Sequence, residues 1–221
     1  MKFSQKEKIA VLGAGSGLGL ELVKKLKTES GLEVGVWSRH WASELEGSSS
    51  IDFFKSDFSQ SQNWSAYAAQ LVDWSPDRWI YCAGGGPYGR YEEKKWEAHE
   101  WAFKVNFLFP SFLMHQMLKE KAFKQALFIG SSIAENHVDP GATSYSASKH
   151  ALRGLILNLI NENNDLDIRL FSPGYMKSKM LPPQSEPVLN GSAREPGQVA
   201  IEIIDWMLTP KAITQAHIVS R

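Results

Sequence analysis

Short apolar runs alternate with helical patterns along nearly the whole chain, and this alternation restricts the possible folds more than any other feature. Seven runs have the length and composition of strands, at residues 9–12, 32–37, 51–54, 79–82, 126–130, 167–171 and 216–219. Helical patterns fill the intervals at 18–29, 62–74, 93–120, 143–162 and 197–208. Strands that are apolar on both faces and separated by helices form parallel sheets that are covered on both sides. We therefore predict an α/β fold of the Rossmann type, with a doubly wound, mostly parallel seven-stranded sheet and helices on both faces.

The length of the chain and the spacing of these elements leave room for one domain. The chain has 221 residues, an ordinary size for a domain with its own core. No internal repeat or low-complexity segment divides it, so we expect a single domain over residues 1–221. The proline-rich segment at about 174–195 follows the sixth predicted strand, and we expect it to be a loop that covers the site.

The charge balance and the cysteine count argue against several classes of protein. Lysine plus arginine and aspartate plus glutamate both number 24, so no basic excess favours nucleic acid or an anionic membrane as a partner. The single cysteine, Cys82, excludes an internal disulfide framework and indicates a cytoplasmic protein. No apolar stretch approaches the roughly 18 residues that span a bilayer, and the charged N-terminus is unlike a signal peptide. The six histidines lack metal-ligand spacing, so no metal site is expected.

A glycine-rich turn directly follows the first predicted strand, and an apolar-periodic helix begins within it. Glycines let the backbone turn tightly and approach a diphosphate, which the N-terminus of a helix attracts. The spacing differs from Gly-x-Gly-x-x-Gly, and a glycine turn alone could be a simple connection. Its place after the first strand of an alternating pattern favours a nucleotide site. The residues of this predicted site are Gly13, Gly15, Ser16, Gly17, Leu18 and Gly19.

The end of the second predicted strand bears on the type of nucleotide. A carboxylate that binds the ribose 2′-hydroxyl of NAD would fall here, but the chain has Ser38 followed by Arg39. No acid repels a 2′-phosphate, and Arg39 could pair with one; the alternative is that Arg39 is simply solvated. We therefore predict that NADP(H) is the preferred cofactor and that NAD(H) is possible.

Tyr145 and Lys149 suggest the chemistry most directly. Residues four apart on a helix lie on the same face, so the phenol and the ammonium are predicted to point into one site. A neighbouring positive charge lowers the pKa of a phenol, which can then exchange a proton with a carbonyl or alcohol oxygen near neutral pH. The same spacing occurs at 91/95 and at 175/179, but only Tyr145 and Lys149 lie between a predicted strand and a long helix.

Together these motifs resemble the short-chain dehydrogenase/reductase family, and the resemblance covers almost the whole chain. The motifs that follow the family's order are the glycine turn, Asp57, Ala83-Gly84, Asn106, Ser132, Tyr145 with Lys149, and Pro173-Gly174. Ser132 lies thirteen residues before Tyr145, an interval common in the family, and Ser131 is the nearby competitor. Two departures are Leu12, where threonine is common, and Tyr81-Cys82, where two asparagines are frequent; they remove a polar tie near the adenine end.

The resemblance implies an oxidoreductase that transfers a hydride between NAD(P) and a small carbonyl or alcohol substrate. It implies that Tyr145 is the general acid or base and that Ser132 stabilises the substrate oxygen. Lys149 would lower the pKa of Tyr145 and bind the nicotinamide ribose, and Asn106 would hold a water of a proton relay. Beyond the glycine turn, the residues implied to contact the cofactor are Ser38, Arg39, Asp57, Phe58, Ala83, Gly84, Tyr145, Lys149, Pro173, Gly174, Met176 and Ser178.

The resemblance also implies a homodimer or homotetramer that pairs through the helices at 93–120 and 143–162. The residues beside the motifs that could line a substrate pocket are Tyr88, Ile133, His137, Tyr175, Met176 and Met180. Alternatives stay open for single residues, because Asn106 could be structural and Asp57 could be a helix cap. The rival function is a catalytically silent NADP(H)-binding regulatory or sensor protein, which would be expected to lose Tyr145 or Lys149.

Overall fold

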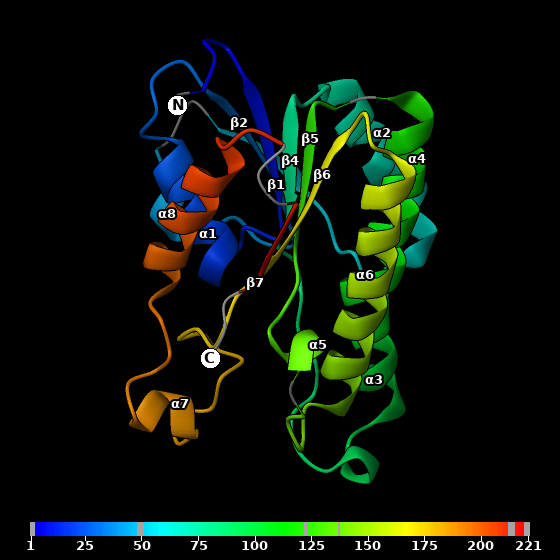
Figure 1. The fold of residues 1–221 in the computed structure, drawn as a ribbon, viewed down its shortest axis with the longest axis vertical. Coiled ribbons are helices and arrows are strands. Elements are labelled where there is room, and N and C mark those ends of the chain that lie inside the picture. The colour runs from blue at the N-terminus through cyan, green and yellow to red at the C-terminus, as the bar shows by residue number, and fades with distance from the viewer. Residues whose placement is uncertain (1–2, 48–50, 122, 137, 212–214, 219–221) are drawn as a thin grey trace.

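A parallel sheet lies at the centre of the computed structural model, which describes residues 3–47, 51–121, 123–136, 138–211 and 215–218 (Figure 1). The strand order is β3-β2-β1-β4-β5-β6-β7, and every neighbouring pair is parallel. The strands are β1 Lys8–Leu12, β2 Glu33–Ser38, β3 Ile51–Lys55, β4 Arg78–Tyr81, β5 Gln125–Ile129, β6 Asp167–Ser172 and β7 Ala216–Ile218. The predicted fold class is confirmed. The predicted end of the last strand, at residue 219, lies outside the described residues.

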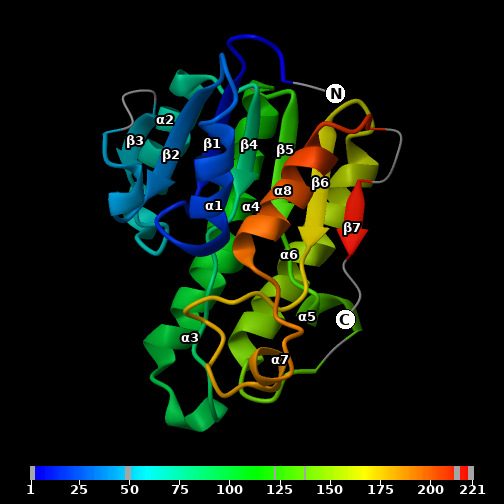
Figure 2. The ribbon, with the colours of Figure 1, turned by 90° about the vertical axis from the view of Figure 1, so that its left-hand side faces the viewer.

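Helices cover both faces of this sheet, as its apolar faces require. Figure 1 shows α1 (Gly17–Leu26) and α8 (Pro196–Met207) on one face, and α2 (Trp64–Trp74), α4 (Phe109–Glu120) and α6 (Thr143–Glu162) on the other. In Figure 2 the first of these layers stands in front of the strands. None of the helices in the described ranges combines the length and apolarity needed to cross a membrane.

Each face of the sheet buries its own core, because successive side chains of a strand point to opposite faces. In β4, Ile80 packs in the core beneath α1 and α8, whereas its neighbours Trp79 and Tyr81 pack in the core beneath α2, α4 and α6. All three side chains are fully buried. The near-continuous apolar strands of the sequence are therefore explained by burial on two sides.

The strand order reverses at β1, which lies between β2 and β4. Connections leave the sheet in opposite directions at such a point and open a crevice at the carboxyl ends of the strands, where ligands bind in folds of this class. The glycine turn after β1 and the segment after β4 both end in this crevice.

The single helix predicted over residues 93–120 is instead two helices joined by a wider turn. A 3₁₀ turn at Tyr91–Glu93 precedes α3 (Trp96–Phe103), a π-helical turn covers Lys104–Leu108, and α4 follows. Pro110 explains the interruption, because a proline has no N–H for the carbonyl of Asn106, its partner in a regular helix.

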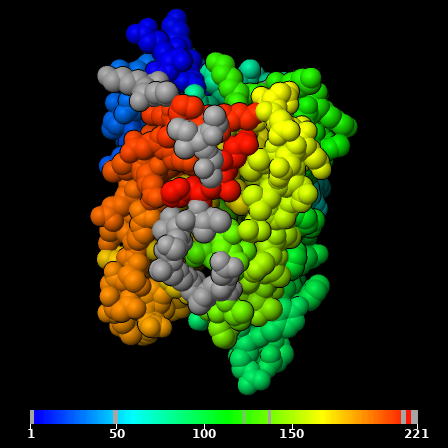
Figure 3. Space-filling view, in the orientation of Figure 1, coloured from blue at the N-terminus to red at the C-terminus, as the bar shows by residue number. Residues whose placement is uncertain are grey.

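The remaining elements are short. Two further 3₁₀ turns are Ser43–Leu45 and Ser61–Asn63, and the short helices are α5 (Ile133–Asn136) and α7 (Glu186–Leu189). The long segment after β6 contains α7, and a parallel bridge between Met176 and Arg194 joins its two ends. Figure 3 shows α8 and this segment along one side of the molecule and α6 along the other.

Candidate active site

A cavity of about 830 Å³ lies at the carboxyl ends of the strands and brings together nearly all of the predicted site. Every residue of the glycine turn that was predicted to bind the nucleotide lines it. The other predicted residues that line it are Ser38, Arg39, Asp57, Phe58, Ala83, Gly84, Ser132, Tyr145, Lys149, Pro173, Gly174, Met176 and Ser178. Asn106 is the predicted catalytic residue that does not.

The glycine turn fits a diphosphate. Gly13 has a φ of +96°, and a Cβ there would overlap the backbone of Ala83, so this position requires glycine. A Cβ at Gly19 would likewise overlap the backbone of Gly13. The helix α1 begins at Gly17, and no side chain caps its N-terminus. Its first backbone N–H groups are therefore available to an anion at the cavity wall.

The residues predicted to surround the adenosine end of the cofactor differ in exposure and in the hydrogen bonds that their side chains form. Arg39 is exposed, lines the cavity, and lies with its guanidinium carbon 6.0 Å from the centroid of the Trp101 ring. Ser38 is buried and donates to the carbonyl of His40 at 2.6 Å. Asp57 accepts from Ser59 N at 3.0 Å and from Ser59 Oγ at 2.7 Å, which is a local turn; it caps neither of the helices that follow, whose N-cap residues are Gln60 and Asn63.

The ring of Phe58 is used by the core. It is 5% exposed and stacks on Phe109 with the centroids 4.4 Å apart. The ring therefore has a packing role, although Phe58 also lines the cavity.

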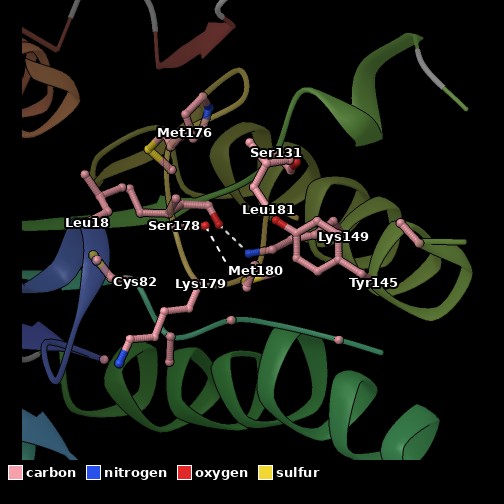
Figure 4. Close-up of a pocket in the computed structure, with 18 of the residues that line it drawn as sticks. Leu18, Cys82, Ser131, Tyr145, Lys149, Met176, Ser178, Lys179, Met180 and Leu181 are labelled. Atoms are coloured by element: carbon pink, nitrogen blue, oxygen red, sulfur yellow. Dashed lines mark hydrogen bonds between the residues drawn. The ribbon is translucent and has the colours of Figure 1, made fainter. Parts of the chain in front are cut away.

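Tyr145 and Lys149 lie in the first two turns of α6 and face the same cavity (Figure 4). Lys149 Nζ donates to the carbonyl of Ile129 at 2.7 Å and lies 5.8 Å from the centroid of the Tyr145 ring. A Cβ at Gly86 would lie 2.9 Å from Tyr145 Cβ, so the segment after β4 packs directly against this tyrosine. The shared face predicted from the spacing of four is therefore present.

The pKa of Tyr145 is shifted in the direction opposite to the prediction. Burial raises the pKa of the phenol, and a hydrogen bond with Ser131 opposes that rise. Burial also lowers the pKa of Lys149, from 10.5 to about 8. The spacing indicated a neighbouring charge, but desolvation is the larger effect on both groups.

Ser131 is the serine whose side chain acts on the pKa of Tyr145, which it lowers against the effect of burial. Its Oγ also accepts from Ile133 N at 3.4 Å. Ser132 is buried, and its backbone N–H donates to the carbonyl of Pro173 at 2.9 Å. Both serines line the cavity, and which of them is the catalytic serine remains a prediction.

A model of the family described as short chain dehydrogenase matches residues 7–188. The chain belongs to this family. Over 161 residues it is 27% identical to a Bos taurus protein named 3-ketodihydrosphingosine reductase. The match covers 67% of this chain and 48% of that protein. The chain spans about half the length of the curated relatives it matches.

Solved structures of dehydrogenases share the fold of this family member. A 4-hydroxyisoleucine dehydrogenase complexed with NADH has a TM-score of 0.84 and 21% identity, with 97% of this chain and 96% of that one covered. An alcohol dehydrogenase from the archaeon Thermococcus sibiricus, complexed with 5-hydroxy-NADP, has a TM-score of 0.79 and 19% identity over 97% and 95% of the two chains. The family resemblance inferred from the motifs is confirmed.

Asn106 lies in the π-helical turn, where it is fully buried. Its Oδ1 accepts from Gly85 N at 3.0 Å, and its Nδ2 donates to Gly85 O at 2.7 Å and to Ser148 Oγ at 2.9 Å. The side chain thus joins the segment after β4 to the helix α6. These contacts are the structural role that the sequence left open, and the proposed water relay remains a prediction.

The segment after β6 closes the cavity of this family member from the side of α7. Tyr88, Ile133, Tyr175 and Met180 line the cavity as predicted, while His137 lies outside the described residues. Trp101 and Lys179 also line the cavity, although neither was predicted to do so. The tryptophan comes from α3 and stands in no motif, whereas the lysine lies in the loop after β6 and was noted only for its spacing from Tyr175. Among the described residues, no group of three or more His, Cys, Asp or Glu side chains could hold a metal ion.

Proposed function

We propose that the protein is an NAD(P)-dependent oxidoreductase that interconverts a small carbonyl compound and an alcohol. The observation that supports it best is the contact of Tyr145 with Ser131 inside the cavity into which the glycine turn also opens. The names of the relatives agree with this class of reaction, since they include a ketone reductase and two dehydrogenases, one complexed with NADH and one with 5-hydroxy-NADP.

The residues of the chain divide the work of proton transfer. The dinucleotide supplies or accepts the hydride at the carbon atom when it is bound. Tyr145 gives its proton to the carbonyl oxygen in reduction and takes it back from the alcohol in oxidation. Ser131 donates its one hydroxyl hydrogen to the phenolate that remains, which lowers the cost of the charge. Lys149, one helical turn away, binds the nicotinamide ribose and is a source of positive charge near the phenolate.

Other residues bind the dinucleotide and hold the site in place. The backbone N–H groups at the start of α1 hold the diphosphate, and Arg39 pairs with a 2′-phosphate, so NADP(H) is preferred and NAD(H) is possible. Asn106 fixes the segment at Gly85 against α6 and holds a relay water. We further propose a cytoplasmic homodimer or homotetramer that pairs through α4 and α6, because Phe103 and Leu108 beside these helices are exposed.

A catalytically silent sensor is the less favoured reading, because the tyrosine, the lysine and a serine are all present in one cavity. The test is cofactor oxidation measured over a panel of aldehydes and ketones with NADPH and with NADH. Tyr145→Phe should lower kcat by at least about 100-fold, which is the usual size of a proton-transfer contribution, and weaken dinucleotide binding far less. Turnover by Tyr145→Phe equal to that of the wild type would remove the phenol from the mechanism.

A further inference from the structure

Glu135 is a buried carboxylate that contacts the elements carrying the site, yet none of the proposed roles uses it. It lies in α5, and its side chain is 6% exposed. Its Oε1 accepts a hydrogen bond from Ser172 Oγ at 2.9 Å, and its Oε2 accepts one from Arg153 Nε at 2.6 Å. Loss of either contact would leave a buried charged or polar group without its partner, which is costly. The carboxylate therefore fixes the three elements relative to one another.

Each of these elements leads directly to a group in the cavity. Ser172 ends β6, immediately before Pro173 and Gly174 in the cavity wall. Arg153 lies on α6, one helical turn beyond Lys149 and two beyond Tyr145. A displacement of α5 relative to these two elements would therefore displace one wall of the site relative to the other.

The shortest connection runs from α5 to the catalytic serine. α5 has only four residues, and its first residue, Ile133, donates its backbone N–H to Ser131 Oγ at 3.4 Å. Because the Ser131 oxygen accepts this bond, its own proton is directed elsewhere, and Tyr145 is the partner. The position of α5 thus determines the position of the serine hydroxyl.

The backbone around Glu135 makes room for this arrangement. A Cβ at Gly130 would lie 2.5 Å from Ser172 Oγ, so any side chain there would push the hydroxyl away from Glu135. Two backbone bonds hold the same two strand ends together, from Gly130 N to Phe171 O at 2.8 Å and from Ser132 N to Pro173 O at 2.9 Å. The absence of a side chain at Gly130 therefore allows the hydrogen bond between Ser172 and Glu135 to form.

We propose that Glu135 is a positioning residue, which holds α5 against β6 and α6 and thereby keeps Ser131 in contact with Tyr145. The proposal rests on the proposed function, because it concerns the geometry of its proton donor. Glu135 itself touches neither substrate nor cofactor. Its effect on the reaction passes through Ser131.

The pKa of Tyr145 reports this geometry without any substrate. The hydrogen bond from Ser131 lowers the pKa of Tyr145 against the effect of burial. A variant that moves Ser131 away should therefore raise the pKa of the phenol. This pKa can be measured by carbon-13 NMR of labelled tyrosine in the full chain, with Tyr145→Phe used to assign the resonance.

The test compares Glu135→Gln with Ser131→Ala and with the double variant. A glutamine keeps the shape but loses the charge that pairs with Arg153, and one of the two acceptor oxygens becomes an N–H donor, so the paired acceptance from Ser172 and Arg153 is lost. We expect Ser131→Ala to raise the pKa of Tyr145 by about one pH unit and Glu135→Gln to give at least about half of that rise. The double variant should match Ser131→Ala, because the effects of two residues that act through one contact do not add.

A matched control separates positioning from loss of stability. Glu7 is equally buried, with a side chain 2% exposed, and its Oε1 accepts from Arg78 Nε at 2.5 Å beside the opposite end of the sheet. Glu7→Gln should lower the melting temperature while leaving the pKa of Tyr145 unchanged. If Glu135→Gln does not fold, Ser172→Ala removes one of the two contacts and should raise the pKa of Tyr145 in the same direction.

The proposal is overturned if Ser131→Ala raises the pKa of Tyr145 and Glu135→Gln and Ser172→Ala do not, or if Glu7→Gln raises it as much. It is also overturned if Ser131→Ala has no effect, since the contact would then be absent. A wild-type protein that reduces no carbonyl compound would count against the proposed function, whereas the NMR result would still decide the role of Glu135. Where turnover is found, Glu135→Gln should lower kcat by about tenfold and leave dinucleotide affinity unchanged. The double variant should have the same kcat as Ser131→Ala alone.

Discussion

Lys149 is a buried ammonium, and its charge should destabilise the folded protein by a measurable amount. The residue is 3% exposed, and burial lowers its pKa from 10.5 to about 8. A difference of about 2.5 between the two pKa values corresponds to a penalty of about 3 kcal/mol. Below pH 8 both folded and unfolded chains are protonated, so the full penalty applies. Between pH 8 and 10.5 only the unfolded chain keeps the proton, so the stability of the folded protein rises with pH across this window.

The variant Lys149→Met isolates this contribution. The methionine cannot donate to the carbonyl of Ile129, but that loss is the same at every pH and cancels when two pH values are compared. Relative to the variant, the wild type should therefore gain about 2 to 3 kcal/mol in its free energy of unfolding between about pH 7 and about pH 10. Urea unfolding of the protein without dinucleotide, followed by tryptophan fluorescence at both pH values, gives this difference.

Lys119→Met is the matched control, because Lys119 is an exposed residue of α4. Its free energy of unfolding should follow that of the wild type at both pH values. Parallel stability curves for wild type and Lys149→Met would refute the reasoning, since they would mean that Lys149 is hydrated in the folded protein.

Two further predictions concern the cofactor end of the cavity. Gly13→Ala should lower stability by about 2 kcal/mol or more and abolish dinucleotide binding, because both the φ of +96° and the Ala83 backbone oppose a Cβ. Gly47→Ala, at a φ of +77° with no atom near the added Cβ, should show the smaller conformational cost alone in thermal unfolding, and an equal loss in both variants would contradict the steric argument. Arg39→Ala should weaken NADPH binding by at least about tenfold and leave NADH binding nearly unchanged, in a titration of tryptophan fluorescence. Equal losses for the two dinucleotides would show that Arg39 does not bind a 2′-phosphate.

The sheet could be predicted from the sequence because burial on both faces leaves a direct pattern of apolar residues. The seven runs correspond to the seven strands, and within the described residues no end differs by more than one residue. The continuity of the helix at 93–120 could not be predicted as well, because its interruption depends on one missing N–H. Pro110 is visible in the sequence, yet the apolar periodicity continues on both sides of it and hides the wider turn around Asn106.

The residues of the site were easier to find than their local roles. The motifs placed the glycine turn, Tyr145 and Lys149 in one cavity, because order along the chain and the carboxyl ends of parallel strands determine that much. The choice between Ser131 and Ser132 depends on the direction of the chain after β5, which no spacing rule contains. The sign of the Tyr145 pKa shift depends on burial, which the pair of residues alone does not reveal.

The spacing of four that relates Tyr145 to Lys149 on α6 continues to Arg153. Tyr145, Lys149 and Arg153 follow one another at intervals of four, so they form a column on one face of the helix. Lys149 is bound to the carbonyl of Ile129 at the end of β5, and Arg153 is bound to Glu135 in the short helix that follows. The column therefore docks α6 onto β5 and α5 through the same face that presents the phenol. Because the docking contacts and the phenol share this face, a substitution that shifts α6 must also shift Tyr145, and the contact with Ser131 is the part of the site most exposed to such a shift.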